Sequence, residues 1–244
     1  ATYGGNTDNK YTQQYGRQQG KYYVPQRASA GLDPWVTPQA YDNAKEFFDT
    51  GITWSNSLNV AQMLEKSSYS ISLGNTHQDG IISSTGMDRY NVKVSADTKL
   101  TNNWSSGFTA NYITTSIDKA VTSGNGLLRT VYAAPPSYDL AGIPSHVDGN
   151  QYTQNSFRGS FDNAYWSMDN NKFTEDTNRF FGNVYASYQT DFGTTNHKLN
   201  AKYMVGVDAY TTHYVDSYGY GSNTGGGRGQ IENYGWTNAT YNSL

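Results

Sequence analysis

The feature that most constrains the fold is a period of two in residues 87–113. Apolar and aromatic residues take every second position in each of two arms, and polar residues take the positions between them. Successive side chains of a β-strand point to opposite sides, so the pattern predicts two strands, each with an apolar and a polar face. A short connection at 101–103 joins them into a hairpin. We expect the apolar face to carry Tyr90, Val92, Val94, Ala96, Phe108, Ala110 and Tyr112. We expect the polar face to carry Lys93, Asp97, Thr109 and Asn111.

Each arm of this hairpin is about 10 residues long, the length that a tilted β-strand needs to cross a lipid bilayer. Taken alone, the apolar face fits a protein core and a lipid environment equally well. The rest of the chain has to distinguish the two.

The same alternation recurs elsewhere in the chain and predicts further strands. They cover 52–60, 67–77, 179–190 and 198–210, with a last alternating piece from Ile231. The connections between strands alternate in length: 61–66, 101–103 and 191–196 are short, whereas 79–86, 117–177 and 212–229 are longer. A chain that runs up and down in this way has all its tight turns at one end, as outer-membrane β-barrels do. A β-sandwich has no reason to keep this rhythm.

Composition supports long β-strands and argues against several other classes of protein. Only 15% of the 244 residues are charged, well below the roughly 25% of an average soluble protein. The net charge of −3, without a basic cluster among the aromatic residues, gives no case for nucleic acid binding. The chain has no cysteine, which excludes disulfides. It also has no run of about 18 apolar residues, but a β-barrel conceals its lipid face in every second position.

Two short segments suggest local helix or turn structure. LLRTVYA (127–133) predicts a short helix that ends before Pro135 and Pro136, because proline cannot continue a helix. For YDNAKEFF (41–48), a capped turn leading into the next strand is favoured over a helical turn.

No pattern in the chain predicts catalysis or a metal site. Its four histidines are scattered, and no partner residues stand at ligand spacing. Six acidic residues in the long connection are what any solvated loop contains: Asp139, Asp148, Asp162, Asp169, Glu175 and Asp176. The glycine-rich segment 216–229 lacks the lysine and the following helix of a phosphate-binding loop. We therefore expect neither an enzyme nor a cofactor.

The positive functional signal is the density of aromatic and amide side chains in the predicted loops. Flat aromatic rings stack on sugar rings, and amides hydrogen-bond to hydroxyl groups. The candidate residues for contact with a substrate or a partner are Tyr138, Tyr152, Phe157, Tyr165, Trp166, Tyr218 and Tyr220. The alternative is that these rings pack on one another or on a partner lipoprotein.

Five segments in series also resemble the SusC/RagA family of TonB-dependent outer-membrane transporters. They are FFDTGITWSNSLNV (47–60), YSISLGNTHQDGIISSTGMDRYNVKVSADTKLTNNW (69–104), LLRTVYAAPPSYDL (127–140), FDNAYWSMDNNKFTEDTNRFFGN (161–183) and HKLNAKYMVGVDAY (197–210). The segments occur in family order and cover about two-thirds of the chain with the residues between them. One departure is Ala164, where the family pattern has proline between the asparagine and the aromatic pair.

The resemblance implies an all-β fold: an antiparallel up-and-down transmembrane β-barrel segment, about 7–8 strands of a larger barrel, with long extracellular loops. Residues 1–47 would be the first extracellular loop region, and 117–177 and 212–229 would be further extracellular loops. The plug domain is absent from the chain, which we expect to be part of a longer polypeptide.

The resemblance also implies a function and partners. The whole protein would import oligosaccharides, or peptides, through the outer membrane of a Gram-negative bacterium. Its partners would be a SusD-like surface lipoprotein, the TonB complex reached through the missing N-terminal part, and membrane lipid. One alternative is a secreted all-β carbohydrate-binding module whose apolar faces form a sandwich core. The other is a self-closed eight-strand barrel, against which the alternation loses its phase between Trp236 and Ala239.

Overall fold

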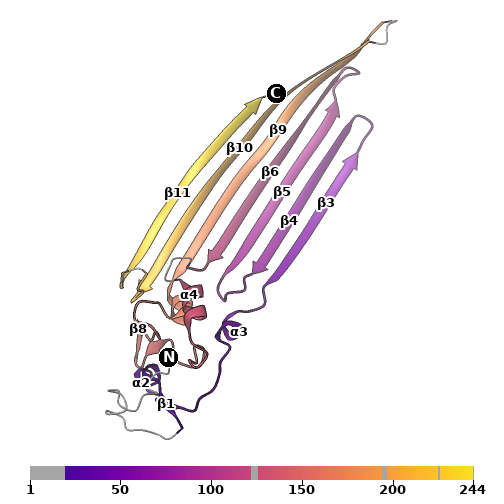
Figure 1. The fold of residues 1–244 in the computed structure, drawn as a ribbon. Coiled ribbons are helices and arrows are strands. Elements are labelled where there is room, and N and C mark those ends of the chain that lie inside the picture. Colours follow the sequence, from indigo (N-terminus) through magenta and orange to yellow (C-terminus); the bar gives the residue numbers. More distant parts are fainter. Residues whose placement is uncertain (1–19, 122–125, 194–196, 225, 244) are drawn as a thin grey trace.

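The computed structural model describes residues 20–121, 126–193, 197–224 and 226–243. The protein is mostly β, and its main element is an open antiparallel sheet of seven strands. The strands are β3 (Ile52–Met63), β4 (Ser67–Asp79), β5 (Gly86–Lys99), β6 (Trp104–Lys119), β9 (Lys172–Phe192), β10 (His197–Tyr220) and β11 (Arg228–Ser243). They lie in the order β11-β10-β9-β6-β5-β4-β3 (Figure 1). The sheet does not close on itself, so the eight-strand barrel is not formed by the residues described.

The predicted hairpin is β5 and β6, and its faces are as predicted. Val92 pairs with Tyr112, and Val94 pairs with Ala110. The same register continues across the sheet, so that one side, the apolar face, carries the apolar residues of the hairpin and their cross-strand partners. These partners include Leu58, Val60, Ile71, Leu73, Phe180, Val184, Val205 and Val207. Among the described residues, no second sheet covers this face. A β-sandwich requires such a second sheet.

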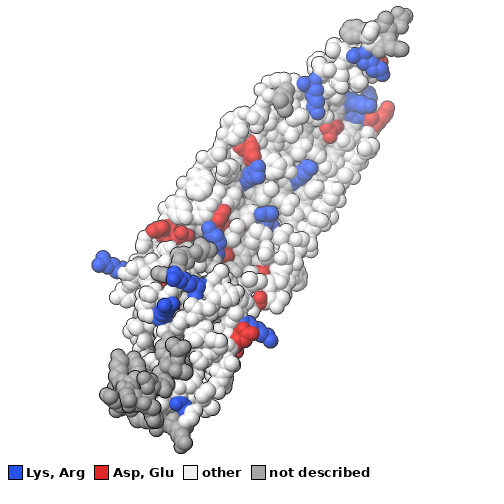
Figure 2. All heavy atoms as spheres, viewed as in Figure 1, with Lys and Arg blue, Asp and Glu red and all other residues white. Residues whose placement is uncertain are grey.

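The opposite side of the sheet, the polar face, carries the residues between them. Charged side chains of both signs lie along it (Figure 2). It is the more crowded side of β6, where Gly107 and Thr115 are buried, while Phe108 and Tyr112 on the apolar face are 44% and 47% exposed. A methyl group on Gly107 would stand 2.3 Å from Asp97 Oδ1, so only glycine leaves room for that side chain.

Several strands extend further than the alternation of apolar residues predicts, and β9 and β10 extend the most. β9 begins at Lys172 rather than at 179, β10 continues to Tyr220, β6 continues to Lys119, and β11 begins at Arg228. Residues 117–119, 172–177, 212–220 and 228–229 therefore belong to strands, which corrects the predicted loop boundaries. Over these extensions of β9 and β10, both faces carry mostly polar or aromatic residues. The alternation between an apolar and a polar face is therefore not visible there in the sequence. The pairing of β11 with β10 is also continuous. Trp236 lies on the polar face, and Ala239 lies on the apolar face. The alternation of apolar residues therefore shifts by one position, while the pairing of the strand continues without a break.

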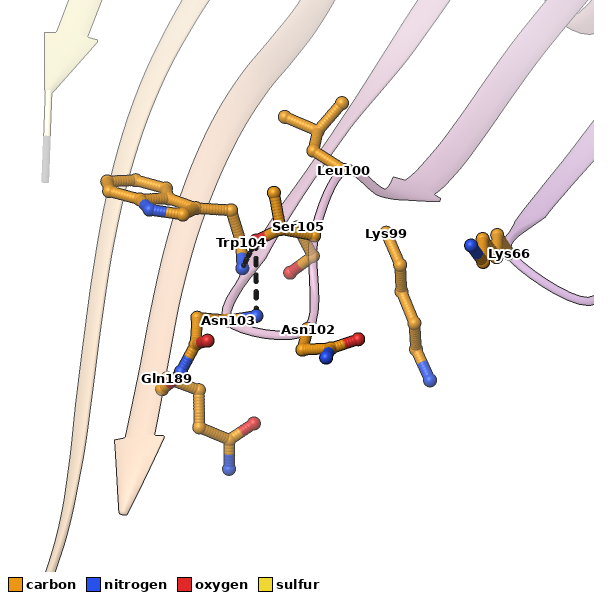
Figure 3. A pocket seen from close by; sticks show the side chains of 9 residues that line it. Lys66, Lys99, Leu100, Asn102, Asn103, Trp104, Ser105 and Gln189 are labelled. Atoms are coloured by element: carbon orange, nitrogen blue, oxygen red, sulfur yellow. Dashed lines mark hydrogen bonds between the residues drawn. The ribbon is translucent and has the colours of Figure 1, made fainter. Parts of the chain in front are cut away.

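All the tight connections lie at one end of the sheet, as the alternating lengths predicted (Figure 1). Hydrogen bonds tie neighbouring turns together at this end. Lys99 N–H donates to the carbonyl of Lys66 at 2.7 Å, and the Asn103 side chain donates to the carbonyl of Gln189 at 2.7 Å. Beside these bonds lies a pocket of about 280 Å³, the turn pocket (Figure 3). It is lined by Lys66, Lys99, Leu100, Thr101, Asn102, Asn103, Trp104, Ser105 and Gln189.

At the other end, the long connections fold together into a small assembly, the loop unit (20–50, 126–171 and 221–224). Its helices are α2 (Pro25–Ser29), α3 (Asn43–Phe47), α4 (Leu127–Ala133) and α5 (Ala164–Asn170). Its ribbons pair β1 (Tyr22–Tyr23) with β2 (Trp35–Val36) and β7 (His146–Val147) with β8 (Asn150–Gln154). Its core consists of Tyr22, Val24, Phe47, Leu127, Val131, Tyr138, Leu140, Ile143, Phe157 and Ala164.

The helix α4 has the predicted bounds and stops before the two prolines. At 41–48, the favoured capped turn was wrong. The segment forms the helix α3, capped by Asp42, whose carboxylate accepts the backbone N–H of Lys45 at 3.1 Å. Burial of Phe47 in the core of the loop unit supplies the packing that the sequence could not indicate. Among the described residues, no helix has the length and apolar composition needed to cross a membrane.

Candidate binding surface

Three aromatic rings form a cluster on the polar face, near the loop unit. We call Tyr214, Tyr234 and Trp236 the aromatic platform. Tyr214 of β10 pairs with Tyr234 of β11, and their rings stack with centroids 5.0 Å apart and an interplanar angle of 9°. The ring of Trp236 lies 5.2 Å from that of Tyr214. Tyr234 and Trp236 are 45% and 51% exposed, so flat aromatic surface remains accessible to a ligand.

An ion pair borders the aromatic platform on the side of β6 and β9. Lys119 Nζ lies 3.1 Å from Glu175 Oε2 and 4.5 Å from the centroid of the Tyr214 ring. The ammonium group thus contacts a carboxylate and the negative face of an aromatic ring at once. This places charged hydrogen-bonding groups directly beside the rings.

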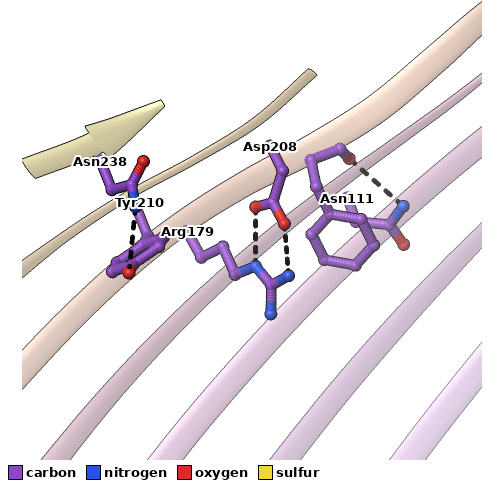
Figure 4. A network of polar contacts seen from close by, with 6 residues as sticks. Asn111, Arg179, Asp208, Tyr210 and Asn238 are labelled. Carbon is purple, nitrogen blue, oxygen red and sulfur yellow. Dashed lines mark hydrogen bonds and ion pairs between the residues drawn. The ribbon is translucent and has the colours of Figure 1, made fainter. Parts of the chain in front are cut away.

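Further along the polar face, toward the tight turns, lies a second polar network (Figure 4). Arg179 donates two hydrogen bonds to Asp208, at 2.9 and 2.5 Å, and its guanidinium lies 4.9 Å from the ring of Phe181. Asn238 donates to the hydroxyl of Tyr210 at 3.5 Å. A bidentate ion pair of this kind holds both side chains in a fixed orientation.

A shallow hollow of about 420 Å³ adjoins this network on the polar face. Its lining combines amides, a carboxylate and an aromatic ring: Thr109, Asn111, Phe181, Gly182, Asn183, Met204, Gly206, Val207, Asp208 and Asn242. Amides offer donors and acceptors together. The polar face from this hollow to the aromatic platform therefore presents the groups that bind neutral, hydroxyl-rich or amide-rich molecules.

The structure buries three of the seven aromatics predicted from sequence inside the loop unit. Tyr138, Phe157 and Trp166 are 1%, 8% and 1% exposed, so they contact the core of the loop unit. The indole of Trp166 donates to the carbonyl of Gln151 at 2.9 Å. These three rings stabilise the loop unit from within. They therefore follow the alternative given in the sequence analysis, in which the loop aromatics pack inside the protein instead of facing a ligand.

The other four predicted aromatics are more open. Tyr165 packs against Phe47, and Tyr218 packs against Phe173. Tyr152 and Tyr220 face each other with centroids 6.4 Å apart and are 55% and 64% exposed. Of the seven candidates, this last pair is the one that the structure leaves most accessible.

Buried hydrogen bonds centred on Asp162 join two connections of the loop unit. Its carboxylate accepts hydrogen bonds from Gln154 Nε2 at 2.6 Å, Ser222 Oγ at 2.7 Å and the backbone N–H of Asn223 at 2.6 Å. The side chain of Asp162 is only 3% exposed. The β10–β11 connection is thereby fixed to the segment that leads into α5.

Three tyrosines of the loop unit, Tyr22, Tyr41 and Tyr165, have pKa values above the ordinary tyrosine range. Burial raises the pKa of Tyr165, and the carboxylates of Glu46 and Asp139 raise it further. Burial also raises the pKa of Tyr22, with Asp139 adding to the effect. In each case the cost of placing a phenolate in a desolvated, acidic surrounding favours the neutral form.

The described residues contain no group of three or more His, Asp or Glu side chains arranged to hold a metal ion. His77 comes nearest, with Nδ1 2.7 Å from Asp88 Oδ1 and Nε2 3.4 Å from Asp79 Oδ1. Each ring nitrogen therefore already faces a carboxylate oxygen.

Sequence reasoning missed Tyr210, Tyr234 and Trp236 because it sought contact residues only in predicted loops, and it passed over Tyr214 although this residue fell in the predicted loop 212–229. A signal was nevertheless present. Tyr210 and Tyr214 stand in the phase opposite to Val205 and Val207 of the same strand. Large aromatic residues on the polar side of an alternating strand indicate a surface meant for contact. A comparison of the chain with protein-family models finds no match, and a search of curated proteins finds none either.

Proposed function

We propose that this chain forms part of the wall and outer mouth of a TonB-dependent outer-membrane transporter of the SusC type. The observation that carries the proposal is the apolar face, which is exposed over seven strands and has no covering layer in the described residues. An apolar surface of this extent is stable in lipid and a liability in water.

The distribution of charge on the two faces supports a lipid environment. On the apolar face, Asp88 and Asp176 lie near the loop unit, and His197 lies near the tight turns. Between these two levels, no described position of this face carries a charged or histidine side chain. Over the same stretch, the polar face carries Lys93, Asp97, Arg179, Lys202 and Asp208. Barrel strands alternate in this way because one side meets lipid and the other meets the lumen.

Aromatic residues border the aliphatic band of the apolar face on both sides. Tyr69, Trp104 and Tyr203 lie toward the tight turns, and Trp54 and Tyr90 lie toward the loop unit. All five are between 42% and 65% exposed. Tyrosine and tryptophan are enriched at the two interfaces of a membrane, because the apolar ring contacts lipid there while the polar group contacts water. The band between them contains aliphatic residues such as Ile71 and Val94.

This orientation assigns the remaining parts. The tight turns face the periplasm, the loop unit faces the cell exterior, and the polar face lines the lumen. The aromatic platform then stands in the path of an oligosaccharide or peptide entering from outside. A SusD-like lipoprotein would cover the mouth, and the plug and its TonB contact would come from other parts of the polypeptide. The open edges at β3 and β11 would pair with further strands.

Single-cysteine labelling tests the orientation, because the chain has no cysteine of its own. Val92→Cys and Lys93→Cys are adjacent residues on opposite faces, so they form a matched pair. In the transporter as the cell makes it, in purified outer membranes, a lipid-soluble quencher should reach a fluorophore on Cys at position 92. A water-soluble maleimide should react more readily at position 93.

The proposal would be contradicted by quenching at position 93 with faster maleimide reaction at position 92, or by equal reaction of both positions with the water-soluble reagent. A protein that remains dispersed without detergent and unfolds cooperatively in buffer would instead support the secreted carbohydrate-binding module. Unchanged outer-membrane levels of both variants serve as the control for folding.

A further inference from the structure

The turn pocket combines positive charge with an adjoining apolar surface. Two lysines, Lys66 and Lys99, line it from two different hairpins, and its described lining contains no carboxylate. The nearby Asp97 accepts a hydrogen bond from the hydroxyl of Tyr185 at 2.5 Å on the polar face. Glu65 and Asp97 line an adjoining pocket together with both lysines, but neither lysine forms an ion pair with a described carboxylate. Two ammonium groups without a carboxylate partner in the lining favour a multiply charged anion.

The pocket is built from turns that hold one another in place. Lys99 is hydrogen-bonded through its backbone to Lys66, and Thr98 Oγ1 also donates to the Lys66 carbonyl at 3.3 Å. Thr101 Oγ1 accepts the backbone N–H groups of Asn103 and Trp104 at 3.2 and 3.0 Å. Three neighbouring hairpins are thus fixed together before a ligand arrives, which lowers the entropy cost of binding.

The pocket lies at the end of the sheet and borders both faces: Lys99, Ser105 and Gln189 are in the register of the polar face, and Trp104 is in that of the apolar face. Leu100 and Trp104 are 62% and 46% exposed, and the Trp104 ring packs on Tyr188 of the apolar face. Figure 3 shows Leu100 pointing back along the sheet, while the side chains of Lys99 and Gln189 point the opposite way. The lining is therefore apolar toward the strands and cationic or amide beyond them. This is the order of groups in a phospholipid, from acyl chain to phosphate.

We propose that the turn pocket binds the phosphate headgroup of an anionic phospholipid in the leaflet that faces the tight turns. The ammonium groups of Lys66 and Lys99 contact the phosphate oxygens, the amide of Asn102 donates to the headgroup, and Leu100 and Trp104 contact the first part of the acyl chains. The inference rests on the proposed function, since it requires the apolar face to lie in lipid. Basic residues at a membrane surface and aromatic rings at its border are both favourable there.

The test is native mass spectrometry of the complete transporter in detergent with added phosphatidylglycerol. The variant Lys66→Gln/Lys99→Gln should bind this lipid about thirtyfold more weakly, on the order of fivefold for each lysine. The matched control is Lys93→Gln/Lys202→Gln, which removes the same charge from the polar face and should leave binding unchanged. Lys66→Arg/Lys99→Arg should retain binding and shows that the turns still fold.

Equal loss in both glutamine variants, or no loss in either, would overturn the site. A large excess of inorganic phosphate should compete poorly, because it lacks acyl chains. Competition by inorganic phosphate as strong as by the lipid would overturn the lipid assignment in favour of a free anion. If the proposed function itself fails, the wild-type protein will need no detergent and bind no lipid, an outcome distinct from a lysine-independent lipid complex.

Discussion

The sheet and the loop unit are stabilised in different ways. Apart from Phe173, Val121 and small residues, the buried apolar side chains of the described structure belong to the loop unit, where Trp166 and Tyr138 are each 1% exposed. The sheet holds its strands by backbone ladders and keeps its large apolar residues exposed, such as Val184 at 53%. One chain therefore contains a region with its own core and a region whose apolar surface no other described element covers.

This difference indicates where each region gets its stability. Burial of apolar surface is the main driving force of folding in water, and the loop unit has it. Backbone hydrogen bonds alone contribute little net stability in water, because the unfolded chain bonds to water instead. In lipid, by contrast, an unpaired backbone group costs several kcal/mol, so a ladder becomes decisive. Under the proposed function, the loop unit is stable in water and the sheet is stable in lipid. Four predictions test this contrast.

The largest effect is expected from removing the largest fully buried side chain of the loop unit. Trp166→Ala leaves a large cavity and an unpaired Gln151 carbonyl, and should lower the local stability of the loop unit by about 4 kcal/mol. Limited proteolysis within 126–171, measured on the protein in membranes, should become much faster. Trp236→Ala, on the exposed aromatic platform, is the matched control and should not change the cleavage rate. Equal cleavage of Trp166→Ala and wild type would contradict a loop unit with its own core.

A charge in the middle of the apolar face should have the next largest effect. Val94→Arg places a guanidinium where lipid is expected and should destabilise the inserted protein by about 3 kcal/mol. The neighbouring Ser95→Arg, which points to the polar face, should cost little. Urea unfolding of the protein from phospholipid vesicles measures both values. If both variants unfold alike, the sheet does not separate lipid from water.

The aromatic platform should matter for binding rather than for stability. Trp236→Ala removes accessible stacking surface and should weaken ligand binding by about 1 kcal/mol, or about fivefold. Titrations with glucose, xylose and mannose oligosaccharides and with a peptide digest would identify the class of ligand. Phe108→Ala, an equally exposed ring on the apolar face, should leave the affinity unchanged. A loss of the same size in Phe108→Ala would show that the two faces are not functionally distinct.

The same contrast explains what the sequence could and could not predict. The strands were visible wherever an apolar face alternates with a polar one, as at Val92 and Lys93. The strand ends at Lys172 and Tyr220 were not, because both faces are polar or aromatic there. The face of each hairpin residue follows from local pattern and is confirmed by the register.

The arrangement of the loop unit could not be predicted, because its contacts join distant parts of the chain. The hydroxyl of Tyr22 donates to the carbonyl of Ser137, and the ring of Phe47 packs on Tyr165. No local pattern encodes such partners, so buried and exposed loop aromatics looked alike. The aromatic platform similarly depends on the register between β10 and β11, which brings Tyr214 opposite Tyr234.

The smallest predicted effect concerns the pH dependence of the loop unit's stability. The pKa of Tyr165 is raised in the folded protein by burial and by Glu46 and Asp139. The neutral phenol is therefore favoured by folding. Its contribution to stability is complete below the unfolded pKa of about 10 and is lost as pH rises through the folded pKa. Tyr165→Phe keeps the ring but cannot ionise, so the loss of stability as pH rises above about 10 should be smaller in this variant. Near-ultraviolet circular dichroism during denaturant unfolding would follow the loop unit. Because Tyr22 also has a raised pKa, part of the loss should persist in Tyr165→Phe. An identical loss in variant and wild type would mean that Tyr165 does not couple proton binding to folding.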